Sequence, residues 1–228
     1  MDGLIEELSN TKVGCHVEGV CVKNISYADD MVLLSPSIGA LKRLLHICER
    51  YAVAHGLKYN VSKSELMVFK VGSKTHTVPR LTLAGSPLKT VTKFKYLGHW
   101  VTDNFSDNLD IERERRSLAV RCNIPQPAAF CVSFYSCGLW LDYTQGAYNE
   151  LRVQYNNAFR VLLGLPRRCS ASGLFTEART DGFAAVMRKR CASLEARLHA
   201  SPNRILSVFA SCSDSPMLAR WKSLHVKI

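Results

Sequence analysis

The sequence lacks the features that would assign it to several common protein classes. It has no apolar run approaching the roughly 18 residues of a membrane span, and its start, MDGLIEELSN, is acidic where a signal peptide is basic and apolar. Its nine cysteines include no C-x-x-C pair, so neither a zinc ribbon nor a disulfide framework is indicated. A Gly-rich nucleotide loop, an acyl-transfer triad and histidines at metal-ligand spacing are also missing. We expect an intracellular protein, in the nucleus or the cytoplasm, without a membrane partner and with reduced, mostly buried cysteines.

Acidic residues are scarce relative to basic ones. There are 19 Asp and Glu against 30 Lys and Arg, which gives a net charge of +11. Residues 1–110 carry a net charge of +2, with 13 basic and 11 acidic side chains, whereas residues 111–228 carry +9, with 17 and 8. A polyanion is the natural partner of such a surface, because each neutralised phosphate releases condensed counterions. A solvated basic face is the equal alternative.

The first half of the chain alternates β-rich runs with one strong helical pattern. Apolar runs at residues 20–26 and 31–35 flank a short polar segment and predict a hairpin. Residues 37–55 carry apolar side chains at helical spacing, with Ser37 as the N-cap and Gly56 as the stop. Further strands are predicted at residues 66–71, 81–84 and 94–102, the last broken near Gly98.

The second half is helical in pattern. Helices are predicted at residues 108–121, 145–163 and 182–199, separated by prolines and a serine-rich stretch. The expected fold class is therefore α+β, with an antiparallel hairpin and further strands covered by a helix, followed by a mostly helical region. We place the domain boundary between residues 105 and 106, which gives domains 1–105 and 106–228.

The tetrapeptide Tyr27-Ala28-Asp29-Asp30 carries the chemistry of this sequence. Two adjacent carboxylates at a tight turn between strands project toward one end of the hairpin, where both can reach a hard divalent cation. Such cations bind nucleotide phosphates and stabilise both oxygens of an in-line displacement. A plain Asp-Asp turn is the alternative, because aspartate is common in hairpin turns.

Three segments of the first half follow one another in an order shared with a known family. NISYADDMVLLS at residues 24–35 is followed by GLKYNVSKSE at 56–65, after CERY at 48–51, and by FKYLG at 94–98. These segments resemble the metal-binding hairpin, the next motif and the primer grip of reverse transcriptases from non-LTR (LINE-like) retrotransposons. GLW, YNNAFR and LLGLPR, within residues 138–167, resemble the thumb side of the same elements. The resemblance implies a partial polymerase palm in residues 1–105 and a thumb-like region in 106–228.

The resemblance also implies roles for single residues. Asp29 would ligate the catalytic Mg²⁺ (or Mn²⁺), and Asp30 would support the site. Lys63 would lie near the leaving pyrophosphate and donate a proton as negative charge develops there; a solvated lysine at a turn is the alternative. Tyr27 would pack beneath the hairpin and face the primer end.

The primer-grip segment gives a second group of candidates. Phe94, Tyr96, Leu97 and Gly98 would position the primer strand. For the aromatic residues, with Trp100 beside them, a place in the core is an equal alternative, because aromatic side chains at strand spacing usually fill cores. The implied partners are an RNA template, a DNA primer and deoxynucleotides.

The sequence departs from the family before the hairpin. The family's polymerase needs another aspartate from an upstream strand and a Gly-containing motif, and neither occurs in the 26 residues that precede Tyr27. Two carboxylates cannot hold two cations in octahedral geometry without water replacing protein ligands. We therefore expect inactivity alone, or completion by a chain that supplies the missing palm and fingers. We also expect the hairpin to expose an unpaired edge, and Pro125 and Pro127 to shorten a connection of the thumb.

The residues and the resemblance together are compatible with two functions. The first is a truncated RNA-directed DNA polymerase of retrotransposon origin, with two-metal nucleotidyl transfer by ancestry. The alternative is a non-catalytic, basic nucleic-acid-binding remnant, whose affinity would fall steeply with salt. A pseudogene product without a role is a third reading.

Overall fold

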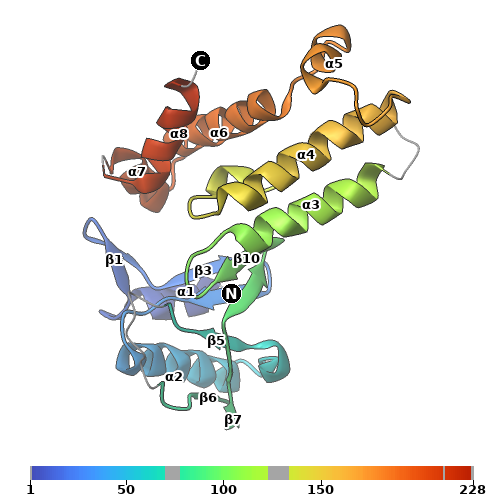
Figure 1. The fold of residues 1–228 in the computed structure, drawn as a ribbon. Coiled ribbons are helices and arrows are strands. Elements are labelled where there is room, and N and C mark those ends of the chain that lie inside the picture. The colour runs from blue at the N-terminus through green and yellow to red at the C-terminus, as the bar shows by residue number, and fades with distance from the viewer. Residues whose placement is uncertain (1, 70–77, 123–133, 213, 227–228) are drawn as a thin grey trace. The chain divides into compact units, whose positions relative to one another are not determined.

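The computed structural model describes residues 2–69, 78–122, 134–212 and 214–226, which form two compact units (Figure 1). The first consists of Met1–Thr92 and Pro202–Ser211, and the second of Lys93–Ser201 and Cys212–Ile228. In the described parts of the chain, no helix combines the length and the apolar character needed to cross a membrane.

Short strands and helices make up the first unit. Its helices are α1 (Asp2–Ser9), α2 (Ile38–Ala54), η1 (Val61–Lys63) and α7 (Arg204–Ser211). Its strands are β1 (Cys15–Val17), β2 (Val20–Val22), β3 (Asn24–Tyr27), β4 (Asp30–Leu33), β5 (Glu65–Met67), β6 (Thr82–Leu83), β7 (Ser86–Pro87) and β8 (Lys89–Val91). The pairs β1–β2, β3–β4 and β6–β7 are antiparallel, and β5–β8 is parallel. The strands thus form separate pairs rather than the single covered sheet that the sequence suggested.

The helix α2 confirms the prediction for residues 37–55 to within one residue at each end. The Ser37 side chain accepts a hydrogen bond from the Ala40 amide at 3.2 Å and so caps the helix. Gly56 follows with a φ of +64°, a left-handed conformation that glycine adopts at little cost. The predicted N-cap and the predicted stop of this helix are therefore both confirmed.

Two buried clusters hold α2 in place. Leu44 and Cys48 pack against α1, while Leu45 packs against the strand side of the unit. The clusters consist of Leu4, Leu8, Leu44 and Cys48, and of Leu45, Leu66, Leu81 and Leu83. Because burial of each such side chain contributes on the order of 2 kcal/mol, these contacts position α2 and the strands beside it.

Two predicted strands are shorter than the apolar runs that suggested them. The strand β5 ends at Met67, and residues 70–71 of the predicted 66–71 lie outside the described residues. In the predicted 81–84, the chain leaves β6 at Ala84 because this residue turns with a φ of 50° toward β7. The Ala84 amide donates to the Glu49 carboxylate at 2.7 Å, so a side chain of α2 fixes this turn.

A buried lysine divides residues 20–26, which we predicted as one strand, into β2 and β3. Lys23 is 6% exposed, and its ammonium donates to the carbonyl oxygens of Ser9 (3.1 Å) and Thr11. Ser9 is the last residue of α1 and Thr11 comes just after it, where a helix leaves its last acceptors unpaired and its dipole is negative. The backbone leaves the strand at Lys23 because its side chain reaches these carbonyls instead of alternating across a sheet.

Replacing Lys23 with methionine is expected to lower the free energy of unfolding by about 1–3 kcal/mol, because the carbonyls of Ser9 and Thr11 lose a charged, buried donor. Urea unfolding followed by circular dichroism measures this change. The matched control is Lys58→Met, because Lys58 is exposed, and its effect should stay within about 0.5 kcal/mol. Equal effects of the two variants would contradict a stabilising role of the Lys23 ammonium.

The second unit combines one hairpin with a bundle of helices. Its strands are β9 (Lys93–Tyr96) and β10 (His99–Thr102), which pair antiparallel. Its helices are α3 (Asn108–Cys122), η3 (Cys137–Leu139), α4 (Gln145–Leu162), α5 (Ala171–Glu177), α6 (Phe183–His199) and α8 (Pro216–Val226). Figure 1 shows α3 and α4 side by side. The predicted helices 108–121, 145–163 and 182–199 are thus confirmed, and with them the α+β class.

The core of the second unit is rich in aromatic side chains. Tyr155 of α4 is fully buried, and its hydroxyl donates to the Asp181 carbonyl at 2.7 Å. Phe134, Phe159, Phe175 and Phe183 surround its ring at centroid distances between 5.1 and 5.9 Å. This cluster joins α4, α5 and α6. Pro125 and Pro127, on which the predicted shortening of the thumb rests, lie outside the described residues.

The described cysteines are all free thiols. Cys48, Cys137 and Cys191 are buried and the other five are half-buried, so the expectation of mostly buried cysteines holds only in part. Burial raises the pKa of Cys48 to about 11 and that of Cys137 to about 12. These thiols stay protonated at neutral pH and act as small apolar side chains.

Candidate active site

The acidic pair lies at the end of the β3–β4 hairpin, as predicted. Tyr27 pairs with Asp30 across the strands, which leaves Ala28 and Asp29 as the two turn residues. Ala28 has a φ of 53°, so the chain reverses tightly there. The turn therefore holds the carboxylates of Asp29 and Asp30 on adjacent residues at one end of the hairpin.

Both carboxylates are exposed, and within the described residues neither takes part in an ion pair. Two adjacent negative charges without a cationic partner repel each other, and a divalent cation relieves that repulsion. Tyr27 is 62% exposed and Ile25 is 46% exposed on the same strand. In the described chain, β3 and β4 pair only with each other, so the hairpin presents unpaired edges and apolar side chains.

The fit of a divalent cation to this turn is incomplete. Carboxylate oxygens are the hard ligands that Mg²⁺ prefers, but Mg²⁺ requires about six ligands in octahedral geometry. In the parts of the chain that the structure describes, no group of three His, Cys, Asp or Glu side chains is placed to hold a metal ion. Asp29 and Asp30 can therefore supply part of a cation site but not a closed one.

Lys63 belongs to the same unit and ends the short helix η1. The Asn60 side chain caps this turn by accepting hydrogen bonds from the Lys63 amide at 3.3 Å and the Ser62 hydroxyl at 2.7 Å. The Lys63 side chain is exposed. Its backbone is thus fixed while its ammonium is free to reach an anion, and the choice between a proton donor and a solvated lysine stays open.

The candidate primer-grip residues lie on the β9–β10 hairpin of the second unit. The predicted strand 94–102 folds back on itself, with Tyr96 paired to His99 and Leu97 and Gly98 forming the turn. This corrects the single broken strand that we predicted. Phe94 and Tyr96 are half-buried, whereas Leu97 is 42% exposed at the tip.

The tip of this hairpin is fixed by Tyr135. The Tyr135 hydroxyl donates to the Leu97 carbonyl at 2.7 Å. Gly98 has a φ of +86°, and a Cβ at this position would lie 3.2 Å from the Tyr135 ring. A side chain at Gly98 would therefore meet both backbone strain and a close aromatic neighbour, so the turn requires glycine.

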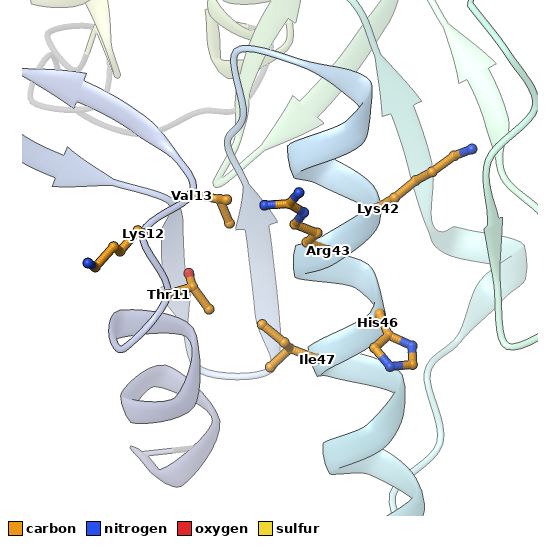
Figure 2. Close-up of a pocket in the computed structure, with 7 residues that line it drawn as sticks. All are labelled: Thr11, Lys12, Val13, Lys42, Arg43, His46 and Ile47. Atoms are coloured by element: carbon orange, nitrogen blue, oxygen red, sulfur yellow. The ribbon is translucent and has the colours of Figure 1, made fainter.

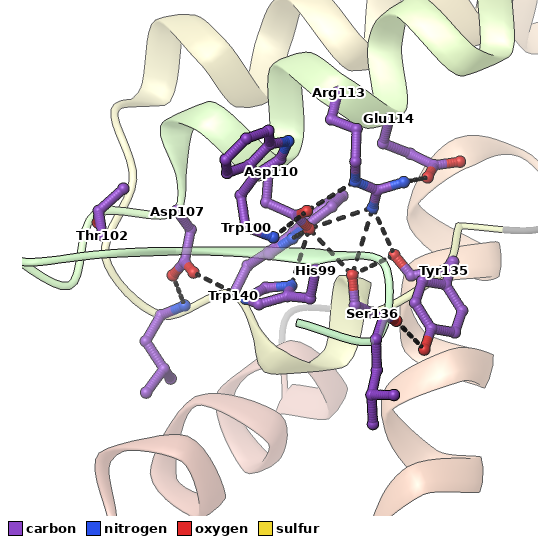
Figure 3. Close-up of polar contacts among 12 residues, drawn as sticks. His99, Trp100, Thr102, Asp107, Asp110, Arg113, Glu114, Tyr135, Ser136 and Trp140 are labelled. Atoms are coloured by element: carbon purple, nitrogen blue, oxygen red, sulfur yellow. Dashed lines mark hydrogen bonds and ion pairs between the residues drawn. The ribbon is translucent and has the colours of Figure 1, made fainter. Parts of the chain in front are cut away.

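A buried charge network ties the same hairpin to α3 (Figure 3). Asp110, in the first turn of α3, is fully buried. Its carboxylate accepts hydrogen bonds from the Arg113 guanidinium (2.7 Å), the Trp140 indole (2.8 Å), the Ser136 hydroxyl (2.9 Å) and the Trp100 amide (3.0 Å). One carboxylate thus joins β10, α3 and the segment around η3.

His99 extends this network to a second buried aspartate. Its Nδ1 lies 3.0 Å from an Asp110 oxygen, and its Nε2 lies 4.0 Å from an oxygen of Asp107. The Asp107 carboxylate accepts hydrogen bonds from the amides of Leu141 (2.6 Å) and Asp142 (3.0 Å). The two acids have different surroundings: a guanidinium neutralises Asp110, whereas backbone amides hold Asp107.

These surroundings shift the two pKa values in opposite directions. Burial alone would raise the pKa of Asp110, but the hydrogen bonds from His99, Arg113 and Trp140 outweigh it and hold that pKa well below its usual range. Burial raises the pKa of Asp107 above its ordinary value, because the amide hydrogen bonds only partly compensate it.

We expect the stability of the second unit to fall as the pH decreases from about 5 toward 2. The pKa of Asp110 is lower in the folded state than in the unfolded state. Its contribution to the free energy of unfolding is therefore present above the unfolded-state pKa and is lost as acid protonates the folded protein. The pKa of Asp107 is raised in the folded state, so protonation of Asp107 increases the free energy of unfolding as the pH falls. Urea unfolding across this pH range should show a flatter profile for Asp110→Asn and a steeper one for Asp107→Asn. The same profile in both variants would contradict this assignment.

The predicted functional residues did not include this network. Asp110, Ile111, Glu114 and Leu118 are all buried on α3. Glu114 accepts hydrogen bonds from Arg113 at 3.0 Å and from Arg121. Acidic residues that share a helical face with Ile111 and Leu118 were the available signal, because such positions point toward a core and require buried partners.

Comparison with known families supports one part of the resemblance. Residues 1–101 match the family model described as reverse transcriptase (RNA-dependent DNA polymerase). The matched range contains the β3–β4 hairpin, Lys63 and the Leu97-Gly98 turn. No curated protein matches the chain. The comparison thus shows a similarity of residues 1–101 to the reverse transcriptase family.

Proposed function

We propose that this chain derives from the RNA-directed DNA polymerase of a non-LTR (LINE-like) retrotransposon, with a palm region in 1–105 and a thumb-like region in 106–228. The observation that carries the proposal is the acidic pair Asp29-Asp30 at a two-residue hairpin turn within the range that matches the reverse transcriptase family. The order of the three motifs along the chain supports the non-LTR type. The ligands that follow are an RNA template, a DNA primer and deoxynucleotides.

The roles of the residues follow from their chemistry. Asp29 offers a carboxylate to a divalent cation, which stabilises the attacking and leaving oxygens of nucleotidyl transfer when it is bound. Asp30 adds negative charge beside it. Lys63, exposed on a capped turn, can donate a proton to a departing pyrophosphate. Tyr27, exposed beside the acidic pair, offers its ring to the primer end.

The β9–β10 hairpin supplies the primer-grip candidates. Phe94, Tyr96, Leu97 and Gly98 lie on a turn that Tyr135 and the Asp110 network hold rigid. A grip must keep the primer end within a fraction of an ångström of its reactive position, and a fixed turn meets that requirement better than a mobile loop. Exposed Leu97 is the side chain of this group most available to a ligand.

The cation site of the described residues lacks a third carboxylate, so we propose that polymerisation requires another segment or chain that supplies it. Primer extension on an RNA template with Mg²⁺ or Mn²⁺ tests this. We expect background incorporation by the chain alone, and incorporation that depends on Asp29 once a palm-and-fingers segment of a related reverse transcriptase is added. With that segment present, equal incorporation by the chain and by its Asp29→Asn variant would remove the catalytic role.

A non-catalytic nucleic-acid-binding role is the second candidate. The incomplete acidic cluster and the net charge of +9 in residues 111–228 favour it. Several phosphate contacts would make log K fall linearly with log salt, by about 0.7 per contact for a single strand. Binding to a labelled RNA that stays constant between low and high salt would exclude this role.

A further inference from the structure

A shallow groove on the first unit lies between the segment that follows α1 and one face of α2 (Figure 2). The volume of the groove is about 460 Å³. Thr11, Lys12, Val13, Lys42, Arg43, His46 and Ile47 line it. The groove involves neither the acidic turn nor Lys63, so it is a feature that the proposed polymerase site does not explain.

The groove has a fixed apolar floor. Val13 and Ile47 are half-buried and pack against the cluster that contains Leu44. The Lys23 ammonium holds the carbonyl of Thr11, so the wall that follows α1 is anchored. Because α2 forms the other wall, a ligand would meet a preformed surface with little ordering cost.

The rims of the groove are cationic. Lys12, Lys42, Arg43 and His46 are all exposed. In Figure 2, the Lys12 and Lys42 side chains extend outward on opposite sides of the gap, and the Arg43 side chain extends from α2 toward it. No acidic residue is among the side chains that line the groove.

These cations also lack partners within the protein. In the described parts of the chain, Lys12, Lys42 and Arg43 form no ion pair, whereas Arg50, further along the same helix, pairs with Glu7 at 2.9 Å. Unneutralised cations from two separate segments, on the rims of one apolar floor, fit a ligand that combines several negative charges with flat apolar groups. Single-stranded nucleic acid has this combination, with phosphates and bases alternating along the strand.

We propose that this groove binds a segment of single-stranded nucleic acid. Lys12, Lys42 and Arg43 contact phosphates, while a base or ribose lies against Val13 and Ile47. The choice of nucleic acid over another polyanion rests on the proposed function and on the net charge of +11. The groove adds a contact for template or product outside the acidic turn.

The first test is the salt dependence of binding to a labelled oligouridylate, measured by fluorescence anisotropy on the full chain. Lys42→Glu/Arg43→Glu should reduce the slope of log K against log salt by about 1.4, because two phosphate contacts are lost, and weaken binding about tenfold at low salt. The matched control is Arg80→Glu/Arg204→Glu, which changes the net charge equally at exposed positions of the same unit. Equal slopes in both double variants would overturn the proposal.

The second test locates the contact in the unaltered chain. Photocrosslinking to RNA that contains 4-thiouridine should give adducts in residues 11–13 and 42–47, as mapped by mass spectrometry. Adducts confined to other segments would overturn the proposal, as would displacement of the RNA by polyglutamate at equal charge concentration. Asp29→Asn/Asp30→Asn should leave these adducts unchanged, so a failure of the polymerase proposal and a failure of the groove are distinguishable.

Discussion

Replacing Asp110 with alanine is expected to lower the free energy of unfolding of the second unit by about 3–5 kcal/mol, because the half-buried Arg113 guanidinium loses the carboxylate that it contacts with two nitrogens and keeps only Glu114 as a counterion. The indole N–H of Trp140 and the amide of Trp100 lose their acceptor at the same time. Asp110→Asn should cost less, since it keeps an acceptor oxygen while it removes the charge. Urea unfolding monitored by tryptophan fluorescence follows the unit directly, because all three tryptophans of the chain belong to it.

The control for this prediction is Glu112→Ala on the same helix. Glu112 pairs with Arg115 at 2.6 Å and Arg116 at 2.7 Å, but these arginines are partly or largely exposed. Pairs of this kind contribute about 0.2–1 kcal/mol. If Asp110→Ala cost no more than Glu112→Ala, the network would not hold the β9–β10 hairpin, and the rigid primer grip would lose its support.

Tyr155→Ala is expected to destabilise the second unit by about 3–5 kcal/mol, because it leaves a cavity among four phenylalanines. Tyr155→Phe keeps the ring and removes the hydrogen bond to the Asp181 carbonyl, so it should cost about 1 kcal/mol. Val153→Ala provides the control, because this neighbour on α4 is 50% exposed. A cost for Tyr155→Ala close to that of Val153→Ala would contradict the aromatic core that joins α4, α5 and α6.

The helices were predictable because their signals are local. Ser37 and Gly56 delimit α2 through a cap and a left-handed stop, and apolar spacing marks the buried face between them. The acidic turn was predictable for the same reason, since two carboxylates between two apolar runs need only their neighbours to form a hairpin. These features depend on contacts a few residues apart.

The parts that the sequence did not predict depend on distant partners. The strand is interrupted at Lys23, whose ammonium contacts the carbonyls of Ser9 and Thr11. The pattern of residues 20–26 does not predict that contact. Asp110 is buried because Trp140 and Ser136, about one turn of η3 apart, converge on it from another segment. A pattern of single residues cannot specify such pairings, because each is decided by packing.

The acidic turn lies within the range that matches the reverse transcriptase family. The match covers residues 1–101, and the acidic pair is exposed at a turn without a neutralising partner among the described residues. Removal of both charges should therefore not destabilise the fold, because Asp29 and Asp30 make no buried contact. A stabilising effect of these two carboxylates should appear only when a divalent cation is bound to them, because without the cation the two charges repel each other.

Cleavage of the backbone by bound Fe²⁺, used in place of Mg²⁺ with ascorbate and peroxide, tests the metal-binding turn most directly. We predict a cut within residues 27–31 that excess Mg²⁺ suppresses and that Asp29→Asn/Asp30→Asn abolishes. It should persist in Glu6→Gln/Glu18→Gln, which removes two exposed carboxylates from the same unit, one of them in the β1–β2 turn. A cut that survives in the aspartate variant, or no cut at the turn in the unaltered chain, would contradict the binding of a divalent cation by Asp29 and Asp30.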